Sequence, residues 1–380
     1  MPSIQTTIWG TIALLLMSGF GHSTDVHNLA IVPQRQNLKN NITRQTGKLI
    51  IPAQFEQADR FSEGLAAVVQ DNKVGYIDRT GKFIIPPRFS VESSSIDFDS
   101  VYRFSEGLAA VKLSDERWIY IDKTGQQEFP TSFSTAYNFS NGLAAVWIGK
   151  KLGYIDRTGK LVIPSASVLY DRKYSRFSEG LVGFAVPVER SHRIGFMDTL
   201  GKVVISPTLQ ESQNFSEGLV AATPDPFGDW KWGYMDKTGK FVIPPQFGLA
   251  NSFSEELAVA RPYSRDGFTN FGYINRQGVW VIPPQFSIAD DFSEGLAAVE
   301  IPERGKGYID KTGKLVIAPQ FQFADSFSEG LARVQVGNQF GYIDKTGKLV
   351  IPPQFDDADS FSEGLAAVYI NGQWGYISRN

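Results

Sequence analysis

The 380-residue chain contains no cysteine and only three histidines. Without cysteine, disulfide bonds, thiol nucleophiles and zinc sites built on thiolates are excluded. His22 and His27 lie near the N-terminus, and His192 stands alone beside Arg193, so the sequence indicates no Ser-His-Asp arrangement. We therefore expect no cofactor and no metal site, and a protein that is not an enzyme.

Neither sign of charge predominates. The chain has 37 Lys and Arg against 40 Asp and Glu, which gives a formal net charge of −3. A nearly neutral sum gives no electrostatic reason to expect nucleic acid or an anionic membrane as a partner. We expect no nucleic-acid partner, and membrane contact only through the N-terminal leader if that leader stays uncleaved.

The apolar run near the N-terminus is short for a membrane span. Residues 8–20 read IWGTIALLLMSGF, whereas a transmembrane helix needs about 20 apolar residues. The run fits the apolar region of a secretory signal peptide, although no Lys or Arg precedes it. We predict a leader over residues 1–23 and a polar linker over residues 24–45. The expected location is the periplasm, the cell envelope or the exterior, with the cytoplasm as the alternative.

Residues 46–380 read as an array of one repeated unit. Three signatures recur in fixed order: T-G-K-L-I-I-P at residues 46–52, F-S-E-G-L-A-A-V at 61–68 and G-Y-I-D at 75–78. The phenylalanines that open the second signature are Phe61, Phe104, Phe139, Phe177, Phe215, Phe253, Phe292, Phe327 and Phe361. Nine copies predict a repeat architecture in which neighbouring units bury one another's apolar faces.

Each unit is typical of three short strands in an up-down meander. The G-Y-I-D strand enters the segment 78–81, whose Asp and Gly suit a type I turn with a bulge glycine. An apolar second strand follows and ends at Pro86, and L-A-A-V supplies the third. Three successive apolar residues in the second strand, as at 161–163, predict burial on both of its faces. The segment 355–359, before the last F-S-E-G, is compatible with a single helical turn.

Two global shapes fit such an all-β array. Repeat lengths near 34 residues are short for a four-stranded propeller blade, which favours tandem three-stranded units in an open superhelical solenoid. The alternative is a closed propeller-like ring. Closure would pair two strands that otherwise lack a partner, residues 48–51 at the start of the array and 375–377 at its end.

The array resembles the WG-repeat family, also called KWG repeats, over residues 46–378. The Trp-Gly pair that names these repeats opens the G-Y-I-D strand at Trp232-Gly233 and at Trp374-Gly375. At the Trp position other copies carry Val74, Leu152, Phe271 or Phe340. The resemblance implies a β-rich repeat array and transfers no catalytic residue to any position of this chain.

Two acidic residues recur with the repeat. The Glu of F-S-E-G is present in eight copies, with Asn141 in the third, and most copies carry the Asp of G-Y-I-D. One could pair them as acid and base or as calcium ligands. A residue present in every unit serves every unit's turn, however, whereas an active site is needed only once. We therefore interpret both as structural, with the Asp capping backbone N–H groups of its turn.

Departures from the repeat are better candidates for function, since insertions in loops escape the constraints of the core. The linkers at 90–103 and 165–176 are long, and the hairpins at 223–230 and 261–270 are extended. Aromatic residues and Arg in these loops are of the types favoured at binding hot spots. The candidate interaction residues are Tyr102, Tyr170, Arg172, Tyr174, Phe227, Trp230, Tyr263, Arg265 and Phe268.

These features favour a non-catalytic binding or scaffold protein that presents loops to a protein, peptide or glycan ligand. Two alternatives stay open. The array is then either a purely structural spacer, or it carries a hydrolase site in an insertion, for example at Asp97 and Asp99.

Overall fold

The computed structural model describes residues 47–91, 101–164, 176–188, 191–224, 230–265 and 269–379. They belong to one compact unit, Gln45–Asn380. These residues form strands and turns and contain no helix, so the all-β prediction is confirmed and the helical turn predicted at 355–359 is wrong. The predicted leader and linker, 1–23 and 24–45, lie outside the described residues.

The repeats, numbered 1 to 9 by their F-S-E-G segments, are built from four kinds of antiparallel strand: a very short first strand, an L-A-A-V second strand, a G-Y-I-D third strand and an outer strand. Repeats 1, 3, 5, 7, 8 and 9 have all four, whereas the sheet of repeat 4 has three. The first strands are β2 (Gln57–Ala58), β8 (Thr135–Ala136), β15 (Glu211–Ser212), β22 (Ile288–Ala289), β26 (Phe323–Ala324) and β30 (Asp357–Ala358). The second strands are β3 (Ala66–Gln70), β6 (Ala109–Lys112), β9 (Leu143–Ile148), β12 (Leu181–Val188), β16 (Leu219–Thr223), β19 (Ala258–Pro262), β23 (Leu296–Ile301), β27 (Leu331–Val336) and β31 (Leu365–Ile370). The third strands are β4 (Lys73–Ile77), β7 (Trp118–Ile121), β10 (Lys151–Asp156), β13 (Ser191–Asp198), β17 (Trp232–Asp236), β20 (Phe271–Ile274), β24 (Gly305–Asp310), β28 (Gln339–Asp344) and β32 (Gln373–Ser378). The outer strands are β1 (Leu49–Phe55), β5 (Phe83–Ser90), β11 (Leu161–Ile163), β14 (Val203–Leu209), β18 (Phe241–Ala250), β21 (Trp280–Phe286), β25 (Leu315–Phe321) and β29 (Leu349–Phe355).

The fourth strand corrects the prediction of three-stranded units. It fits into a repeat of about 34 residues because the first strand is only two residues long and follows the preceding outer strand almost directly. In β18 the two are continuous, so this strand pairs with β17 of repeat 5 and then with β19 of repeat 6. A short period therefore does not exclude a four-stranded unit.

The outer strands are buried on one face only, which corrects the prediction of burial on both. In β18 Ile243 and Phe247 are buried, whereas Val242 is 45% exposed. The same pattern recurs in β5 and β25, where Ile84 and Val316 are about 40% exposed. Six of the eight outer strands are edges of their sheets, whereas β5 and β18 continue into the sheet of the next repeat. The prolines that follow the apolar run limit pairing of such an edge with another strand.

The glycine of the G-Y-I-D strand is required by close packing against the outer strand. A Cβ atom at Gly341 would lie 2.6 Å from the carbonyl oxygen of Ile351 and 2.7 Å from the nitrogen of Pro353. Gly75, Gly233 and Gly375 face equivalent backbone atoms at 2.6–2.9 Å. A register shift spans this glycine, from Phe340–Phe355 to Tyr342–Ile351, which shows that the outer strand bulges opposite it. This glycine, which eight of the nine copies keep and which Ile119 replaces in repeat 2, thus has a steric cause.

Consecutive repeats are joined by an aromatic pair and a hydrogen bond. The Tyr of G-Y-I-D packs against the F-S-E-G phenylalanine of the next repeat, as in Tyr342–Phe361, with ring centroids 4.9 Å apart. The hydroxyl of Tyr342 is buried and donates to the carbonyl oxygen of Asp359 at 2.6 Å, which satisfies both groups.

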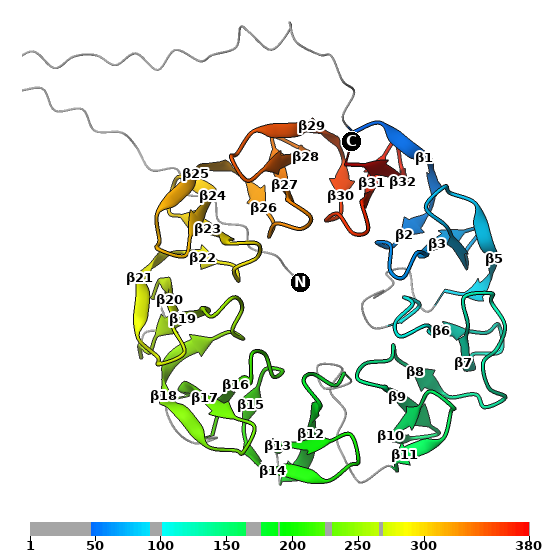
Figure 1. Ribbon diagram of the computed structural model, residues 1–380, viewed down its shortest axis with the longest axis horizontal. Helices are drawn as coiled ribbons and strands as arrows, with labels where there is room; N and C mark the ends of the chain where they lie inside the picture. The colour runs from blue at the N-terminus through cyan, green and yellow to red at the C-terminus, as the bar shows by residue number, and fades with distance from the viewer. Residues whose placement is uncertain are drawn as a thin grey trace, which may run out of the picture. The chain divides into compact units, whose positions relative to one another are not determined.

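Repeat 9 contacts repeat 1 in this same way. Tyr376 packs against Phe61 at 5.1 Å and donates to the carbonyl oxygen of Asp59 at 2.7 Å. The outer strand of repeat 9 is β1, which pairs with β32 through Leu49–Ile377, Ile51–Tyr376 and Phe55–Trp374 (Figure 1). The sequence analysis left these two strands without a pairing strand within their own unit. Their pairing is the contact expected if the array closes into a ring.

Candidate binding surfaces

The strand order gives every repeat two different sides. The F-S-E-G turn and the turn after G-Y-I-D lie at one end of the strands, which we call the turn side. The hairpin loop between the second and third strands lies at the other end, which we call the hairpin side. Each outer strand runs back to the hairpin side, so the segments flanking the long linkers also end there.

On the turn side, the Asp of G-Y-I-D caps its own turn. The Oδ1 atom of Asp78 accepts hydrogen bonds from the backbone N–H of Thr80 at 2.8 Å, the hydroxyl of Thr80 at 2.6 Å and the N–H of Lys82 at 3.1 Å. The same set recurs at Asp236 and Asp344. The hydrogen bond from Thr238 lowers the pKa of Asp236. The structural interpretation of this Asp is confirmed.

The Glu of F-S-E-G adopts a left-handed backbone conformation that is costly for a residue with a side chain. Its φ angle is 53° at Glu63, 52° at Glu217 and 54° at Glu294. A glycine or asparagine would fit such a tight hairpin turn at less cost. The Glu carboxylate reaches the next repeat, where it accepts a hydrogen bond from a backbone N–H, as from Gly107 to Glu63 at 3.0 Å. This hydrogen bond offsets part of the conformational cost.

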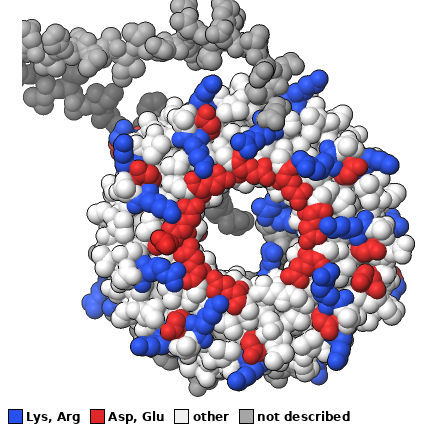
Figure 2. All heavy atoms as spheres, in the orientation of Figure 1, with Lys and Arg blue, Asp and Glu red and all other residues white. Residues whose placement is uncertain are grey.

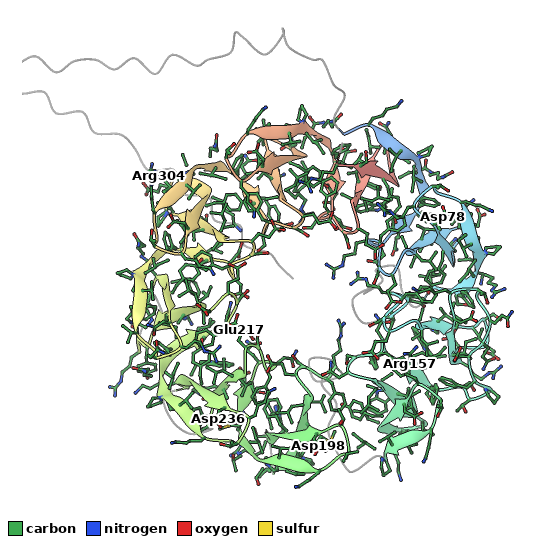
Figure 3. All side chains as sticks on the ribbon, viewed as in Figure 1. Asp78, Arg157, Asp198, Glu217, Asp236 and Arg304 are labelled. Atoms are coloured by element: carbon green, nitrogen blue, oxygen red, sulfur yellow. The ribbon has the colours of Figure 1, made fainter. Side chains whose placement is uncertain are left out.

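This link recurs around the array and includes the step from repeat 9 to repeat 1. Glu363 of repeat 9 accepts from the N–H of Gly64 in repeat 1 at 3.0 Å. Figure 2 shows acidic side chains gathered around the central opening in this view, and Figure 3 places Glu217 on the inner side of its repeat, with Asp198 and Asp236 farther out. The Glu residues thus occupy one inner rim of the turn side.

A cation from the next repeat neutralises most of these carboxylates. It follows the Asp of G-Y-I-D: Lys345 Nζ lies 3.0 Å from Glu294 Oε2 and donates to the Glu294 carbonyl oxygen at 2.9 Å. Equivalent pairs join Lys123 to Glu63 and Lys237 to Glu179 at 3.0–3.1 Å. The rim is therefore a chain of compensated ion pairs, and no described group of three or more Asp, Glu or His side chains could hold a metal ion.

The hairpin side differs from repeat to repeat, and at repeats 5 and 6 it forms a pocket. Trp230, Tyr263 and Arg265 line a cavity of about 250 Å³ together with Arg261 and Thr269. Trp230 is 49% exposed and has a left-handed backbone with φ 50°. The sequence named these three residues on two separate loops, and the structure brings them together.

Two further contacts shape this pocket and were missed from the sequence. The ammonium nitrogen of Lys231 lies 4.5 Å from the centroid of the Tyr263 ring, a cation–π contact. Gly248, in the continuous strand β18, also lines the pocket. A Cβ atom there would lie 2.7 Å from the carbonyl oxygen of Pro262, so a larger residue does not fit. Gly248 interrupts the otherwise apolar end of β18, which is the signal that could have identified it.

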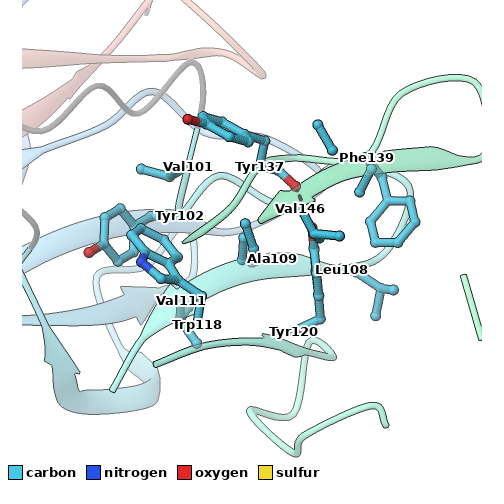
Figure 4. Close-up of a cluster of buried hydrophobic side chains, with 14 of the residues drawn as sticks. Val101, Tyr102, Leu108, Ala109, Val111, Trp118, Tyr120, Tyr137, Phe139 and Val146 are labelled. Carbon is cyan, nitrogen blue, oxygen red and sulfur yellow. Dashed lines mark hydrogen bonds between the residues drawn. The ribbon is translucent and has the colours of Figure 1, made fainter. Parts of the chain in front are cut away.

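Tyr102 does not belong to an exposed loop surface. It is fully buried, its ring packs against Trp118 at 5.4 Å (Figure 4), and its hydroxyl donates to the carbonyl oxygen of Ser90 at 2.8 Å. Its carbonyl oxygen accepts from Tyr76 at 2.6 Å, as the residue two positions before F-S does in other repeats. This spacing from Phe104 is the signal that predicts a core role.

The other candidate loop residues are not described. Tyr170, Arg172, Tyr174, Phe227 and Phe268, and the hydrolase candidates Asp97 and Asp99, lie outside the described residues. His192 lies in strand β13 opposite Pro187 and is half-buried. Among the described residues, no helix is long and apolar enough to cross a membrane.

Three solved structures show a distant likeness to this chain. A computationally designed protein, Ika8, aligns with a TM-score of 0.43 and 12% identity over 74% of this chain and 96% of its own. BamB from Moraxella catarrhalis aligns with a TM-score of 0.37 and 11% identity over 78% and 98%. PorZ, a surface component of the type-IX secretion system of Porphyromonas gingivalis, aligns with a TM-score of 0.31 and 10% identity over 86% and 52%. At such TM-scores none of them bears on function.

Comparison with protein families is decisive, whereas no curated protein matches the sequence at a significant level. The family described as WG containing repeat matches residues 44–73, 75–91, 94–118, 120–151, 194–223, 232–261, 271–301, 307–339 and 340–378. These nine matches cover most of the array and agree with the nine copies found in the sequence. The chain therefore belongs to the family of proteins built from WG-containing repeats.

Proposed function

We propose that this WG-repeat protein is a non-catalytic binding scaffold whose hairpin-side pocket between repeats 5 and 6 receives a peptide or glycan segment. The observation that carries the proposal is Trp230, a large aromatic side chain 49% exposed at the mouth of a cavity of about 250 Å³. Tyr263 and Arg265 complete an aromatic and cationic lining. Trp, Tyr and Arg are the residues most enriched among binding hot spots.

Trp230 is held there at a cost to stability. A left-handed backbone costs a bulky residue about 1–2 kcal/mol, and leaving such a side chain half exposed forgoes part of the burial energy of about 2 kcal/mol. Outlier conformations of this kind concentrate at ligand sites, where the surrounding structure over-determines them. Here the surrounding structure is a single seven-stranded sheet, β15 to β21, which contains both hairpins that form the pocket.

The finer shape of the scaffold that we propose is a closed, propeller-like ring. The pairing of β1 with β32, the Tyr376–Phe61 contact and the Glu363–Gly64 link support it, since each repeats a contact made between consecutive repeats. In Figure 1 the repeats follow one another around a central opening. Small-angle X-ray scattering on residues 45–380 should give a compact profile, and an elongated one would establish the open solenoid.

The ligand proposal is tested with peptide and glycan arrays probed by the full chain, followed by titration of each hit. Trp230→Ala should weaken binding about 10- to 30-fold, the usual loss at an aromatic hot spot. Ile148→Ala is the matched control, because Ile148 is 48% exposed in the hairpin of repeat 3 and lies outside the pocket. Equal losses in both variants, or no hit on either array, would overturn the proposal.

An array without any hit would favour the structural spacer. Turnover of generic ester, phosphate or glycoside substrates would favour the hydrolase instead. Export is part of the proposal and rests on the apolar segment 8–20. N-terminal sequencing of the mature protein from fractionated cells tests it, with cleavage near residue 23 expected and retention of an intact chain in the cytoplasm as the contrary result.

A further inference from the structure

The chain contains two Asn-Gly dipeptides, and each forms the two central residues of a tight turn. Asn141-Gly142 lies in the F-S-E-G turn of repeat 3, and Asn371-Gly372 joins β31 to β32 in repeat 9. Their backbones are nearly the same, with φ of 52° and 80° at the first dipeptide and 54° and 83° at the second. A difference in their chemistry therefore comes from their surroundings.

An Asn that precedes Gly can react with its own backbone. The backbone nitrogen of the Gly attacks Cγ of the Asn, an N–Cγ bond forms, and the side-chain amide leaves as ammonia with the proton of the Gly N–H. Water then opens the five-membered imide at one of its two carbonyl groups. Opening at Cγ gives Asp, whereas opening at the main-chain carbonyl gives an isoaspartyl residue, whose backbone runs through Cβ and Cγ. Gly favours the attack because it has no side chain to hinder it.

At Asn141-Gly142 both reacting groups are held by neighbouring repeats. The N–H of Gly142 donates to the carboxylate of Glu106 in repeat 2 at 3.0 Å. The Oδ1 atom of Asn141 accepts from the N–H of Gly180 in repeat 4 at 2.8 Å. The attacking nitrogen must lose its proton, and the Glu106 carboxylate disfavours a second negative charge beside it. The contacts between repeats therefore protect this dipeptide.

At Asn371-Gly372 neither group is held. Both residues are exposed at the tip of the hairpin of repeat 9, and a Cβ atom at Gly372 would meet no atom within 4 Å. No described residue forms a hydrogen bond with the Asn371 side chain or with the Gly372 N–H. The strand pair next to the tip is Ile370–Gln373. Local opening of a hairpin tip costs far less free energy than unfolding of the array, so the folded protein reaches the reactive geometry.

We propose that Asn371 is a site of spontaneous deamidation in the folded protein, whereas Asn141 is protected. The product carries a carboxylate in place of a neutral amide, and its isoaspartyl form adds a methylene group to the backbone of a two-residue turn. Such turns require a specific backbone geometry, so the isoaspartyl form weakens the pairing of β31 with β32. Because β32 also pairs with β1, the change affects the repeat that joins the two ends of the array.

The test is peptide mapping by mass spectrometry of the full chain during incubation at mildly alkaline pH. A parallel sample unfolded in urea is the reference, and there the two Asn residues should react at similar rates because both precede Gly. In the folded chain Asn371 should react about tenfold faster than Asn141 or more, since only its turn opens locally. Equal rates at the two sites in the folded chain, or an Asn371 that folding slows as strongly as Asn141, would overturn the proposal.

Variants locate the cause of the protection. Glu106→Ala removes the acceptor of the Gly142 N–H, so the reaction at Asn141 should become several-fold faster. Glu329→Ala is the matched control, because Glu329 makes the same hydrogen bond to Gly364 at another junction, at 2.9 Å. Circular dichroism melting checks that both variants fold. An Asn141 rate that stays unchanged in Glu106→Ala, or that rises equally in both variants, would overturn the assignment of this contact as the protecting one.

The consequence for the fold is measured by melting. Asn371→Asp has the charge of the product without the added methylene group. The incubated wild type, enriched in the isoaspartyl form, should melt at a lower temperature than Asn371→Asp. Equal melting temperatures would overturn the claim that the altered backbone weakens repeat 9.

Discussion

The turn side of the repeats is nearly the same in every copy, whereas the hairpin side differs from copy to copy. On the turn side, Asp caps, left-handed Glu residues and their cations recur in nearly the same geometry from copy to copy. On the hairpin side, loops differ in length and composition, and one pair of them forms the Trp230 pocket. The aromatic pairs, the Glu hydrogen bonds and the Glu–cation pairs recur between repeats in the strands and on the turn side. The contact between the Lys231 and Tyr263 hairpins is specific to repeats 5 and 6, so the loops are less constrained by the repeat than the turns are.

The largest difference in stability between a change in the strands and a change in a hairpin loop is expected at glycines. Gly341→Ala places a Cβ atom 2.6 Å from the Ile351 carbonyl oxygen, so we expect a loss of about 3 kcal/mol in the free energy of unfolding. Gly337→Ala, in the hairpin loop of the same repeat, meets no atom within 4 Å and has only the cost of a left-handed φ of 64°, about 1 kcal/mol. Urea denaturation measures both. Equal losses would show that backbone conformation, not the bulge, explains the Trp-Gly motif.

Much of the repeat structure was predictable from the sequence because short local patterns determine its turns. The turn at residues 78–81 follows from turn chemistry, and it is present with Asp78 as its cap. The two-residue first strand was not predictable, because Asp357–Ala358 carries no strand pattern and becomes a strand only by pairing with β31. The exposure of one face of the outer strands was missed because three apolar residues in a row do not reveal that only one face of the strand packs against the core.

The candidate sites were predictable in part. Loop composition indicated Trp230, Tyr263 and Arg265, and the topology brings these residues to one pocket. Loop composition gave a wrong prediction at Tyr102, which is buried. Its position two residues before Phe104, rather than the insertion around it, determines its place in the core. The rim link from Glu to the next repeat was also missed. Its only sequence signal was the joint loss of the Glu at Asn141 and of the cation at Thr199, two positions 58 residues apart.

The framework also contains a titratable position, Asp359, where burial raises the carboxyl pKa to about 6, against the opposing effect of Arg333 and with support from Asp59 and Asp357. In the unfolded chain the pKa is about 3.9, so the folded state binds the proton more tightly. The free energy of unfolding should therefore fall as the pH rises from about 4 to 6.

Asp359→Asn removes that penalty. We expect about 1–3 kcal/mol of added stability at pH 7, since each unit of pKa difference corresponds to about 1.4 kcal/mol, and no change at pH 4. Thermal melts from pH 4 to 8 measure it. Asp236→Asn, at a turn whose hydrogen bond from Thr238 lowers the pKa, should change stability in the opposite direction. The difference in stability between Asp359→Asn and the wild type isolates the contribution of this carboxyl group from that of other titrating groups. A difference that does not grow between pH 4 and 6 would contradict the assignment.

The tyrosine hydroxyl that joins repeats should matter less, because only one hydrogen bond is removed. Tyr342→Phe leaves the buried carbonyl oxygen of Asp359 without its donor at 2.6 Å, and we expect a loss of about 1–2 kcal/mol. Tyr263→Phe on the hairpin side should leave the free energy of unfolding unchanged, since that ring lines a pocket open to solvent. Chemical denaturation of both variants compares them. A neutral Tyr342→Phe would show that the aromatic contact with Phe361 alone joins the repeats.

The smallest effect is expected from the rim ion pairs. Glu294 and Lys345 are 31% and 44% exposed at their side chains, so water screens their attraction, and Glu294→Gln should cost only about 0.5 kcal/mol. Glu303→Gln is a close control, because Glu303 has a similar left-handed φ of 62° but lies in a hairpin loop. A double-mutant cycle with Lys345→Gln isolates the pair, and its coupling should shrink as salt rises. A coupling energy that salt does not change would contradict a screened ion pair, whereas no loss in Glu294→Gln would mean that the hydrogen bond from Gly330, which Gln also accepts, is the contribution of this position.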